Sequence, residues 1–356
     1  MRRALLLVPI VVSFVMNEAP GQEKGKLSLL AYVDYFYNVQ RDPAFGSFSN
    51  TALSGGEAFQ AFQFRRIYFT YDYGITEDVS SRFRLEADQS ALTSDGKIGM
   101  FVKDAYLRWN NVLANDIYLG IQSTPAFETS EGVWGYRSLE KTILDLRGIV
   151  GSRDFGIGVR GSFDKGGLFS YWLLLGNGSG NKPENDKLKR YYANVRVRLQ
   201  PVELTLYADF NPRPDITNPF TSGQVGNSTM TTAGFIGFEP SSKIKLGLEG
   251  FLQSTPNAFN AGTALRTRNA IGLSGFIRWA FAEELELVGR YDHFDPNTHS
   301  SAVGDSRGYI LAGVSWITIP NVQIIPNIQV ETFENSGGQS FEASVTGRIT
   351  VSWSLP

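Results

Sequence analysis

The sequence predicts an all-β fold, a transmembrane antiparallel β-barrel of sixteen strands with short periplasmic turns and long extracellular loops. Three observations predict this fold. Sixteen segments have the pattern of strands, fourteen of them with alternating apolar and polar residues. The connections between them alternate between short and long, and charged residues make up 19% of the chain beside 13% aromatic residues. Short turns at one rim and long loops at the other are typical of barrels in the bacterial outer membrane, where we expect this protein to reside.

Composition narrows the class of protein further. The chain of 356 residues has a formal net charge of −2 and lacks the basic excess of a nucleic-acid binder, so we expect no nucleic-acid partner. It contains no cysteine, which excludes thiol catalysis, cysteine-ligated metal centres and disulfides. A mean hydropathy of −0.15 argues against a helical membrane protein.

The N-terminus has the pattern of an export signal. Arg2 and Arg3 precede an apolar run over residues 4–15, and the small residues Ala19 and Gly21 follow. This run is shorter than the roughly 20 residues that a membrane-spanning helix needs. We therefore expect a signal peptide at residues 1–21 and the barrel at residues 22–356.

Each strand is identified by its period of two, because successive side chains of a strand point to opposite faces. The clearest segment is 341–353, in which Val345, Ile349 and Val351 share one face with other apolar residues and Arg348 lies on the other. Similar alternation predicts strands at 27–39, 62–72, 79–88, 100–110, 116–123, 153–163, 190–199, 204–210, 243–253, 268–281, 285–293, 307–317 and 322–333. Segments 168–176 and 230–239 are apolar on both faces, so their inward residues stay unassigned.

The connections decide between a closed membrane barrel and a soluble β protein. Long links fall at 40–61, 89–99, 124–152, 177–189, 211–229, 254–267 and 294–306. Short links fall at 72–78, 110–115, 164–167, 200–203, 239–242, 282–284 and 318–321. A propeller or a pair of sandwiches would not produce this strict alternation. An even number of strands places both ends of the barrel at the periplasmic rim.

The apolar face of each strand must point toward lipid, since the bilayer tolerates few charges. Aromatic residues near strand ends predict interfacial girdles, although the β-propensity of aromatic residues explains some of them. These residues are Tyr37, Tyr73, Trp109, Phe163, Trp279 and Trp353. Arg65 and Lys103 are assigned to the outward face near the loop ends of their strands, where long side chains can reach the headgroups.

Over nearly its whole mature length the chain resembles the phosphate-selective porin family (porin O/P type) of bacterial outer membranes. The resemblance rests on Lys103-Asp104-Ala105-Tyr106-Leu107, Gly120-Ile121-Gln122-Ser123-Thr124-Pro125, Ser152-Arg153-Asp154-Phe155-Gly156, Asn177-Gly178-Ser179-Gly180 and Gly289-Arg290-Tyr291-Asp292. It implies a general or anion-preferring porin that assembles as a homotrimer. The family usually ends on an aromatic residue, whereas this chain ends Trp353-Ser354-Leu355-Pro356.

Inward positions carry the residues expected to line the channel, since a barrel of about 16 strands encloses water. The candidates are Arg66, Arg82, Arg84, Arg108, Arg160, Arg190, Arg196, Arg198, Arg290 and Arg348, with the carboxylates Glu86 and Asp104. Two interpretations remain open. The arginines form basic tracks for anions, as in anion-selective pores, or they pair with carboxylates and stiffen the wall.

The longest link, 124–152, is the second candidate element, because loops of this length are usually functional. Residues 138–148 predict a short helix with a serine cap and a glycine stop. In porins of this shape the third loop folds into the lumen, which makes Glu128, Glu131, Arg137, Glu140, Asp145 and Arg147 candidate constriction residues. A solvent-facing lid is the alternative.

No motif in the sequence predicts an enzyme. The chain has two histidines and lacks HExxH and P-loop patterns, so we expect neither metal nor cofactor. The sequence predicts a water-filled channel for passive diffusion of small hydrophilic solutes, with a preference for anions such as phosphate, in contact with outer-membrane lipid. The alternative function is a structural or adhesive barrel whose long loops bind a partner and which conducts little.

Overall fold

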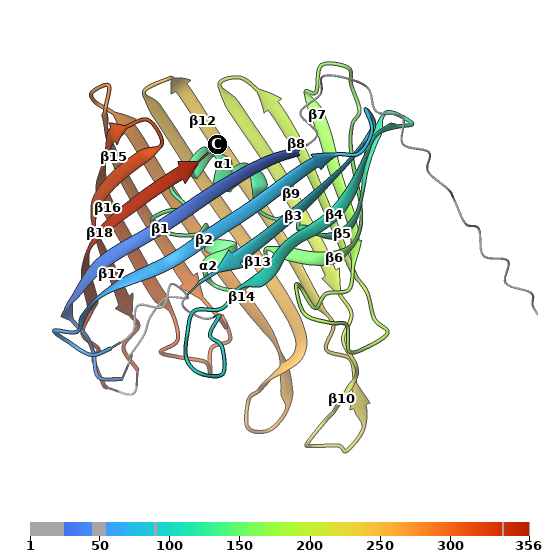
Figure 1. Cartoon of the computed structure of the whole chain (residues 1–356). Helices are drawn as coiled ribbons and strands as arrows, with labels where there is room; N and C mark the ends of the chain where they lie inside the picture. The colour runs from blue at the N-terminus through green and yellow to red at the C-terminus, as the bar shows by residue number, and fades with distance from the viewer. Residues whose placement is uncertain (1–24, 45–54, 89–90, 337, 356) are drawn as a thin grey trace, which may run out of the picture.

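The computed structural model describes residues 25–44, 55–88, 91–336 and 338–355. The predicted signal peptide lies outside these residues. Within them, sixteen antiparallel strands close into a barrel in which β1 pairs with both β2 and β18 (Figure 1). The long loops lie at the lower rim in this view, and the short turns lie at the upper rim together with the start of β1 and the end of β18.

The strands fall close to the predicted segments. They are β1 Gly25–Gln40, β2 Gln60–Gly74, β3 Val79–Ala87, β4 Phe101–Val112, β5 Asn115–Ser123, β6 Arg153–Ser162, β7 Phe169–Gly176, β8 Arg190–Leu199, β9 Val202–Asn211, β12 Thr229–Ser241, β13 Ile244–Asn260, β14 Leu265–Ala280, β15 Leu285–Asp295, β16 Arg307–Ile319, β17 Val322–Phe333 and β18 Ser344–Leu355. Two short strands outside the barrel, β10 Ile216–Thr217 and β11 Gln224–Val225, pair within a long loop.

The largest differences from the sequence prediction lie between β13 and β14 and at the start of the last strand. β13 and β14 continue beyond the predicted ends and shorten the link predicted at 254–267, because their pairing extends to Asn260 and Leu265. The last strand begins at Ser344, so Phe341 precedes it although the alternation had included it. Period two alone does not show where pairing to a neighbour stops.

The outer surface is apolar along the middle of the strands and aromatic near the rims. Leu173, Leu206 and Leu273 project outward from β7, β9 and β14 and are exposed. Phe163 and Trp279 are exposed near the strand ends, as the predicted girdle requires. Closure of the barrel leaves no unpaired strand edge, so this surface is suited to lipid.

Arg65 and Lys103 correct the sequence prediction, because both point into the barrel. A bulge in β2 pairs Tyr32 with Arg66 and the next residue, Val33, with Phe64, and a similar shift in β4 lies at Lys103. A bulge adds one residue to a strand and breaks its alternation, so two successive side chains share a face. Arg65 is consequently buried beside Asp34, and Lys103 is buried beside Glu86.

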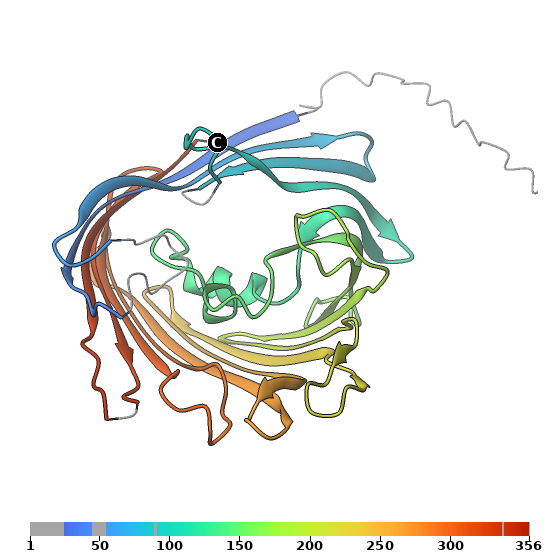
Figure 2. The same ribbon diagram turned by 90° about the horizontal axis from the view of Figure 1, so that it is seen from below.

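The core of the molecule lies inside the barrel, where the link 124–152, here called loop 3, packs against the inner wall (Figure 2). Trp134, Leu139 and Leu146 of loop 3 contact apolar residues of β1, β12 and β14–β17. Ile143 and Leu144 contact a second set on β7–β9, β13 and β14. This packing explains why segments 168–176 and 230–239 are apolar on both faces. Leu174 of β7 and Phe235 of β12 point inward and contact loop 3.

Candidate channel

Loop 3 contains two short helices, and the sequence predicted only one of them in part. α1 spans Glu128–Trp134 and ends at Gly135, whose φ of 67° is left-handed. α2 spans Ile143–Leu146, so the helix predicted over 138–148 is reduced to one turn. It begins after Thr142, without a side-chain cap, because the preceding residues form a turn instead.

Side chains of the wall hold loop 3 by donating to its backbone carbonyl groups. The Nη2 of Arg348 donates to Leu139 at 2.6 Å, and the Nη1 of Arg278 donates to Val133 at 3.1 Å. Arg290 donates to Lys141 and Arg65 donates to Leu139. These hydrogen bonds satisfy carbonyl groups of loop 3 that have no strand partner of their own, because the loop packs on the wall without joining its sheet.

Arg290 and Arg348 therefore point into the barrel but lie under loop 3. Both side chains are almost fully buried. Arg290 forms a bidentate pair with Asp292, and Arg348 contacts Asn327 beside Asp34. Their position is that of anchors for the loop rather than residues of a water-lined surface.

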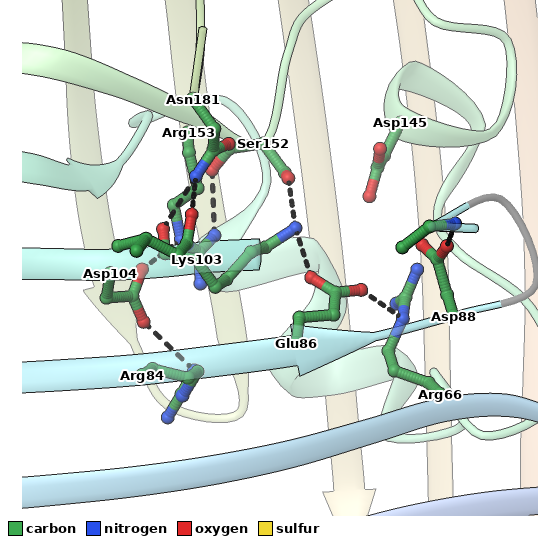
Figure 3. A network of polar contacts seen from close by, with 12 residues as sticks. Arg66, Arg84, Glu86, Asp88, Lys103, Asp104, Asp145, Ser152, Arg153 and Asn181 are labelled. Carbon is green, nitrogen blue, oxygen red and sulfur yellow. Dashed lines mark hydrogen bonds and ion pairs between the residues drawn. The ribbon is translucent and has the colours of Figure 1, made fainter. Parts of the chain in front are cut away.

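A polar network on β2, β3 and β4 brings together several predicted site residues (Figure 3). The carboxylate of Glu86 lies 2.7 Å from Arg66 and 2.8 Å from Lys103. Asp104 pairs with Arg84 at 3.2 Å and with Arg153. Two carboxylates thus hold four cations, of which Arg66 and Lys103 are buried and Arg84 and Arg153 are partly exposed. Arg190 is likewise buried, in a pair with Asp209 at 2.8 Å.

Another group of arginines lies along the open part of the inner wall. Arg82, Arg108, Arg160, Arg196 and Arg198 keep between 26% and 52% of their side chains exposed. Each also has a carboxylate partner: Asp72 for Arg82, Asp116 for Arg108, Glu128 for Arg160, and Glu203 for both Arg196 and Arg198. The arginines of the wall therefore pair with carboxylates, as the second of the two sequence interpretations proposes. The five partly exposed arginines also face the lumen.

The candidate residues of loop 3 divide into exposed and buried ones. Glu128 is 59% exposed and pairs with Arg160 of β6 at 3.2 Å. Arg137 pairs with Glu131 and, at 3.1 Å, with Asp145. Glu140 is fully buried, and Arg147 is buried in a 2.6 Å pair with Glu331 of β17.

Electrostatics keep Asp145 ionised. Burial alone would raise the pKa of its carboxyl, but the charges of Arg137, Lys141 and Arg66 outweigh this effect and lower the pKa to about 2. In Figure 3, Asp145 points from α2 toward Arg66 of β2. Tyr136, also in loop 3, stays neutral because burial raises its pKa to about 12. Its hydroxyl donates to Glu286 at 3.0 Å.

Polar cavities remain along the inner wall. One of about 190 Å³ lies between the start of loop 3 and β6–β9, and Glu128, Arg160 and Arg196 line it. Another of about 280 Å³ lies against β2–β4 near the short turns, and Arg82 and Arg108 line it. Charged groups that border such spaces can replace part of the hydration shell of a passing ion.

The glycine-rich stretch Asn177–Gly180 binds a side chain of the protein itself. The backbone N–H groups of Gly178 and Gly180 donate to Asp154 at 2.8 and 3.2 Å, and Tyr192 donates to the same carboxylate at 2.8 Å. Asn181 then donates to backbone carbonyls of Val102 and Lys103. This motif therefore fastens the following loop to β4 and β6.

Residues that sequence reasoning missed are Arg65, Lys103 and Arg153, which lie at bulges or at a strand start where alternation fails.

In the described part of the chain, no helix is both long enough and apolar enough to cross a membrane. Within the same residues, no three His, Cys, Asp or Glu side chains cluster as a metal site would require.

Neither a protein-family model nor a curated protein sequence matches the chain. Solved structures do. The outer membrane channel DcaP of Acinetobacter baumannii aligns with 93% of this chain and 97% of its own at 11% identity and a TM-score of 0.67. The anion-selective porin from Comamonas acidovorans aligns with 93% of this chain and 99% of its own, at 11% identity and a TM-score of 0.61.

A third similar structure is the trimer form of OmpT, an outer membrane protein of Vibrio cholerae, folded in vitro. It aligns with 94% of this chain and 100% of its own at 12% identity and a TM-score of 0.56. At these identities the likeness concerns the fold. The fold is that of bacterial outer-membrane porins, and its closed, outwardly apolar barrel belongs in the outer membrane.

Proposed function

We propose that this protein is an outer-membrane porin, a water-filled channel for passive diffusion of small hydrophilic solutes that prefers anions. The observation that carries the proposal is the folding of loop 3 into the lumen. Its apolar side is buried against the wall, and one polar cavity remains between it and the arginines of β6 and β8. A loop fixed in this way narrows a channel without closing the barrel.

The preference for anions is supported by the way carboxylates are shared. Four inward carboxylates each contact two cations: Asp34 contacts Arg65 and Arg348, Glu86 contacts Arg66 and Lys103, Asp104 contacts Arg84 and Arg153, and Glu203 contacts Arg196 and Arg198. Each group keeps one positive charge in excess, and arginine suits carboxylate and phosphate geometry. Phosphate selectivity, as in the porin O/P family, is part of the proposal and rests on the resemblance.

Export and assembly complete the proposal. Residues 1–21 act as the signal peptide, and their basic and apolar pattern supports this role. The barrel forms a homotrimer in outer-membrane lipid. The family resemblance supports this, as does the trimer form of the similar OmpT.

Conductance tests the proposal directly. Purified protein in a planar lipid bilayer under a KCl gradient should give stepwise channels whose reversal potential indicates an excess of chloride current. Replacing Arg84 and Arg108 by glutamine should shift the reversal potential toward the cation value, because both side chains are partly exposed on the inner wall. Arg268→Gln is the matched control. Arg268 is exposed near the loop end of β14, so this substitution should leave the reversal potential unchanged. An unaltered reversal potential in the double variant would contradict the anion preference.

The second candidate is a structural or adhesive barrel. The observation that favours it is the length of the outer loops, since β13 and β14 extend into one of them and β10 and β11 form a hairpin in another. Absence of channels in the bilayer would favour this function over the porin.

A further inference from the structure

Arg160 on β6 is held rigidly at the edge of the lumen. Its guanidinium carbon lies 3.4 Å from the ring centroid of Trp172 and 4.4 Å from that of Tyr118. Arg108 lies 5.6 Å from the ring of Tyr118, so rings and guanidinium groups alternate from β4 to β7. Aromatic faces attract a guanidinium group and restrict its movement. Arg160 is therefore oriented before any solute arrives.

The charge of Arg160 is only weakly satisfied by the protein. Its Nη1 lies 3.2 Å from the carboxylate of Glu128, and the Glu128 side chain is 59% exposed. The Nε of Arg160 has no hydrogen-bond partner among the described residues. An ion pair with an exposed partner is weak because water screens it. A solute oxyanion could therefore replace Glu128 and accept two parallel hydrogen bonds from the guanidinium fork.

The cavity beside Arg160 supplies further donors. It measures about 190 Å³, and Arg196, Asn194 and Thr205 of the neighbouring strands line it together with Arg160. Arg196 shares its carboxylate partner, Glu203, with Arg198. When Glu128 moves away, Arg160 and Arg196 are the charged side chains that line the cavity, so the cavity attracts negative charge.

We propose that this cavity is an oxyanion subsite of the channel. The carboxylate or phosphate group of a small solute displaces Glu128 from Arg160 and is held by Arg160 and Arg196, with Asn194 and Thr205 as additional donors. Glu128 of loop 3 acts as a built-in competitor, which keeps binding weak enough for the solute to leave. The transport role of the subsite rests on the proposed porin function, whereas binding itself does not.

Trp172 makes the subsite measurable, because a ligand on Arg160 changes the surroundings of its ring. The folded protein in detergent is titrated with sodium phosphate and, separately, with sodium acetate at constant ionic strength in chloride. We expect a saturable change in tryptophan emission that is lost in Trp172→Phe. A saturable change with either oxyanion supports the subsite. The oxyanion that binds with the lower dissociation constant identifies the solute class. No saturable change with either one overturns it.

Three variants localise the binding. Arg160→Gln should weaken binding at least tenfold, and Glu128→Gln should tighten it severalfold. Arg82→Gln removes the same charge from the other inner cavity and should leave binding unchanged, so an equal loss in Arg82→Gln and Arg160→Gln overturns the proposal. If Arg160→Gln does not fold, Arg160→Lys keeps the charge but not the planar fork and should also weaken binding.

Bilayer recordings separate this proposal from the porin function. Phosphate should reduce the single-channel chloride current in a saturable way, and more strongly in Glu128→Gln. A protein that conducts but shows no saturable effect of either oxyanion retains the channel and lacks the subsite. Saturable binding in detergent without any conductance retains the subsite and contradicts the channel.

Discussion

At the residue scale, the direction of a side chain decides what it can do, and two neighbouring arginines illustrate this. Arg65 and Arg66 both point inward because β2 has a bulge at Arg65, where its pairing with β1 skips one residue. Arg65 then binds Asp34 and the carbonyl group of Leu139, while Arg66 binds Glu86. One residue belongs to the anchor of loop 3, and the other belongs to the network of β2–β4.

Glu86 stabilises the barrel through its two buried cations. In Glu86→Gln, Arg66 and Lys103 lose their carboxylate, and we expect the free energy of unfolding to fall by about 3–5 kcal/mol. Urea unfolding of the folded protein in detergent measures this change. Lys97→Gln, which removes an exposed ion pair with Asp95, is the control and should cause no measurable change. Equal midpoints for Glu86→Gln and the wild-type protein would show that the network contributes nothing to stability.

Asp145 makes stability depend on acid. Its folded pKa of about 2 lies below the ordinary value of 3.8, so the unfolded chain binds the proton more tightly. The contribution of ionised Asp145 to the free energy of unfolding is complete above about pH 4 and is lost as pH falls toward 2. Asp145→Asn should be less stable than the wild-type protein at pH 6.

The difference between Asp145→Asn and the wild-type protein should vanish as pH approaches 2. Urea midpoints across this pH range measure the difference between the two proteins. A difference that stays constant down to pH 2 would contradict an ionised Asp145 in the folded state.

At the element scale, loop 3 explains why the inner wall is not uniformly polar. Phe235, Phe276 and Tyr309 point into the barrel and are buried against Trp134 and its neighbours. An aqueous pore wall alone would favour polar residues at these positions, whereas a loop with an apolar side requires apolar partners. The wall is therefore divided into a part under loop 3, which carries apolar residues and the buried arginines that anchor the loop, and a charged part that faces the lumen.

Trp134 is the largest side chain that fixes loop 3, and it is fully buried. Trp134→Ala should weaken the packing of the loop by about 3–5 kcal/mol. The population of detached loop should then rise roughly a hundredfold or more. Trypsin should cleave after Arg137 or Lys141 correspondingly faster, while the strands stay intact.

Leu173→Ala, on the exposed lipid-facing side of β7, provides the matched control for this cleavage. Its rate should equal that of the wild-type protein, because the substitution leaves loop 3 untouched. Resistance of Trp134→Ala to trypsin would show that the hydrogen bonds from Arg278, Arg290 and Arg348 suffice to hold the loop.

At the scale of the whole molecule, the low charge content and the small net charge have one explanation. One face of every barrel strand meets lipid and carries apolar residues, so the charges gather in the lumen and the loops. Inside the barrel they are arranged as ion pairs, with several carboxylates shared by two cations. A net charge of −2 therefore hides a strongly charged interior.

The orientation of the barrel in the membrane can be tested with epitope insertions. An epitope after Ser222, in the exposed loop between β10 and β11, should bind antibody on intact cells. An epitope after Ser242, in the short turn between β12 and β13, should bind only after the outer membrane is permeabilised. Labelling of the Ser242 insertion on intact cells would reverse the assigned orientation.

The sequence by itself determined the barrel, its sixteen strands and its two kinds of rim. These features depend on local alternation and on link length, both of which are properties of consecutive residues. It also predicted inward arginines such as Arg84, Arg108 and Arg160, and the length of the link 124–152 marked that link as a functional element.

Only the tertiary structure decided what each inward residue contacts. Arg160 and Arg348 lie on strands with the same alternation, yet one faces a polar cavity and the other lies under loop 3. The bulges that turn Arg65 and Lys103 inward arise from pairing with neighbouring strands. Pairing register and the path of loop 3 depend on residues far apart in the chain, and a pattern of period two carries no information about such contacts.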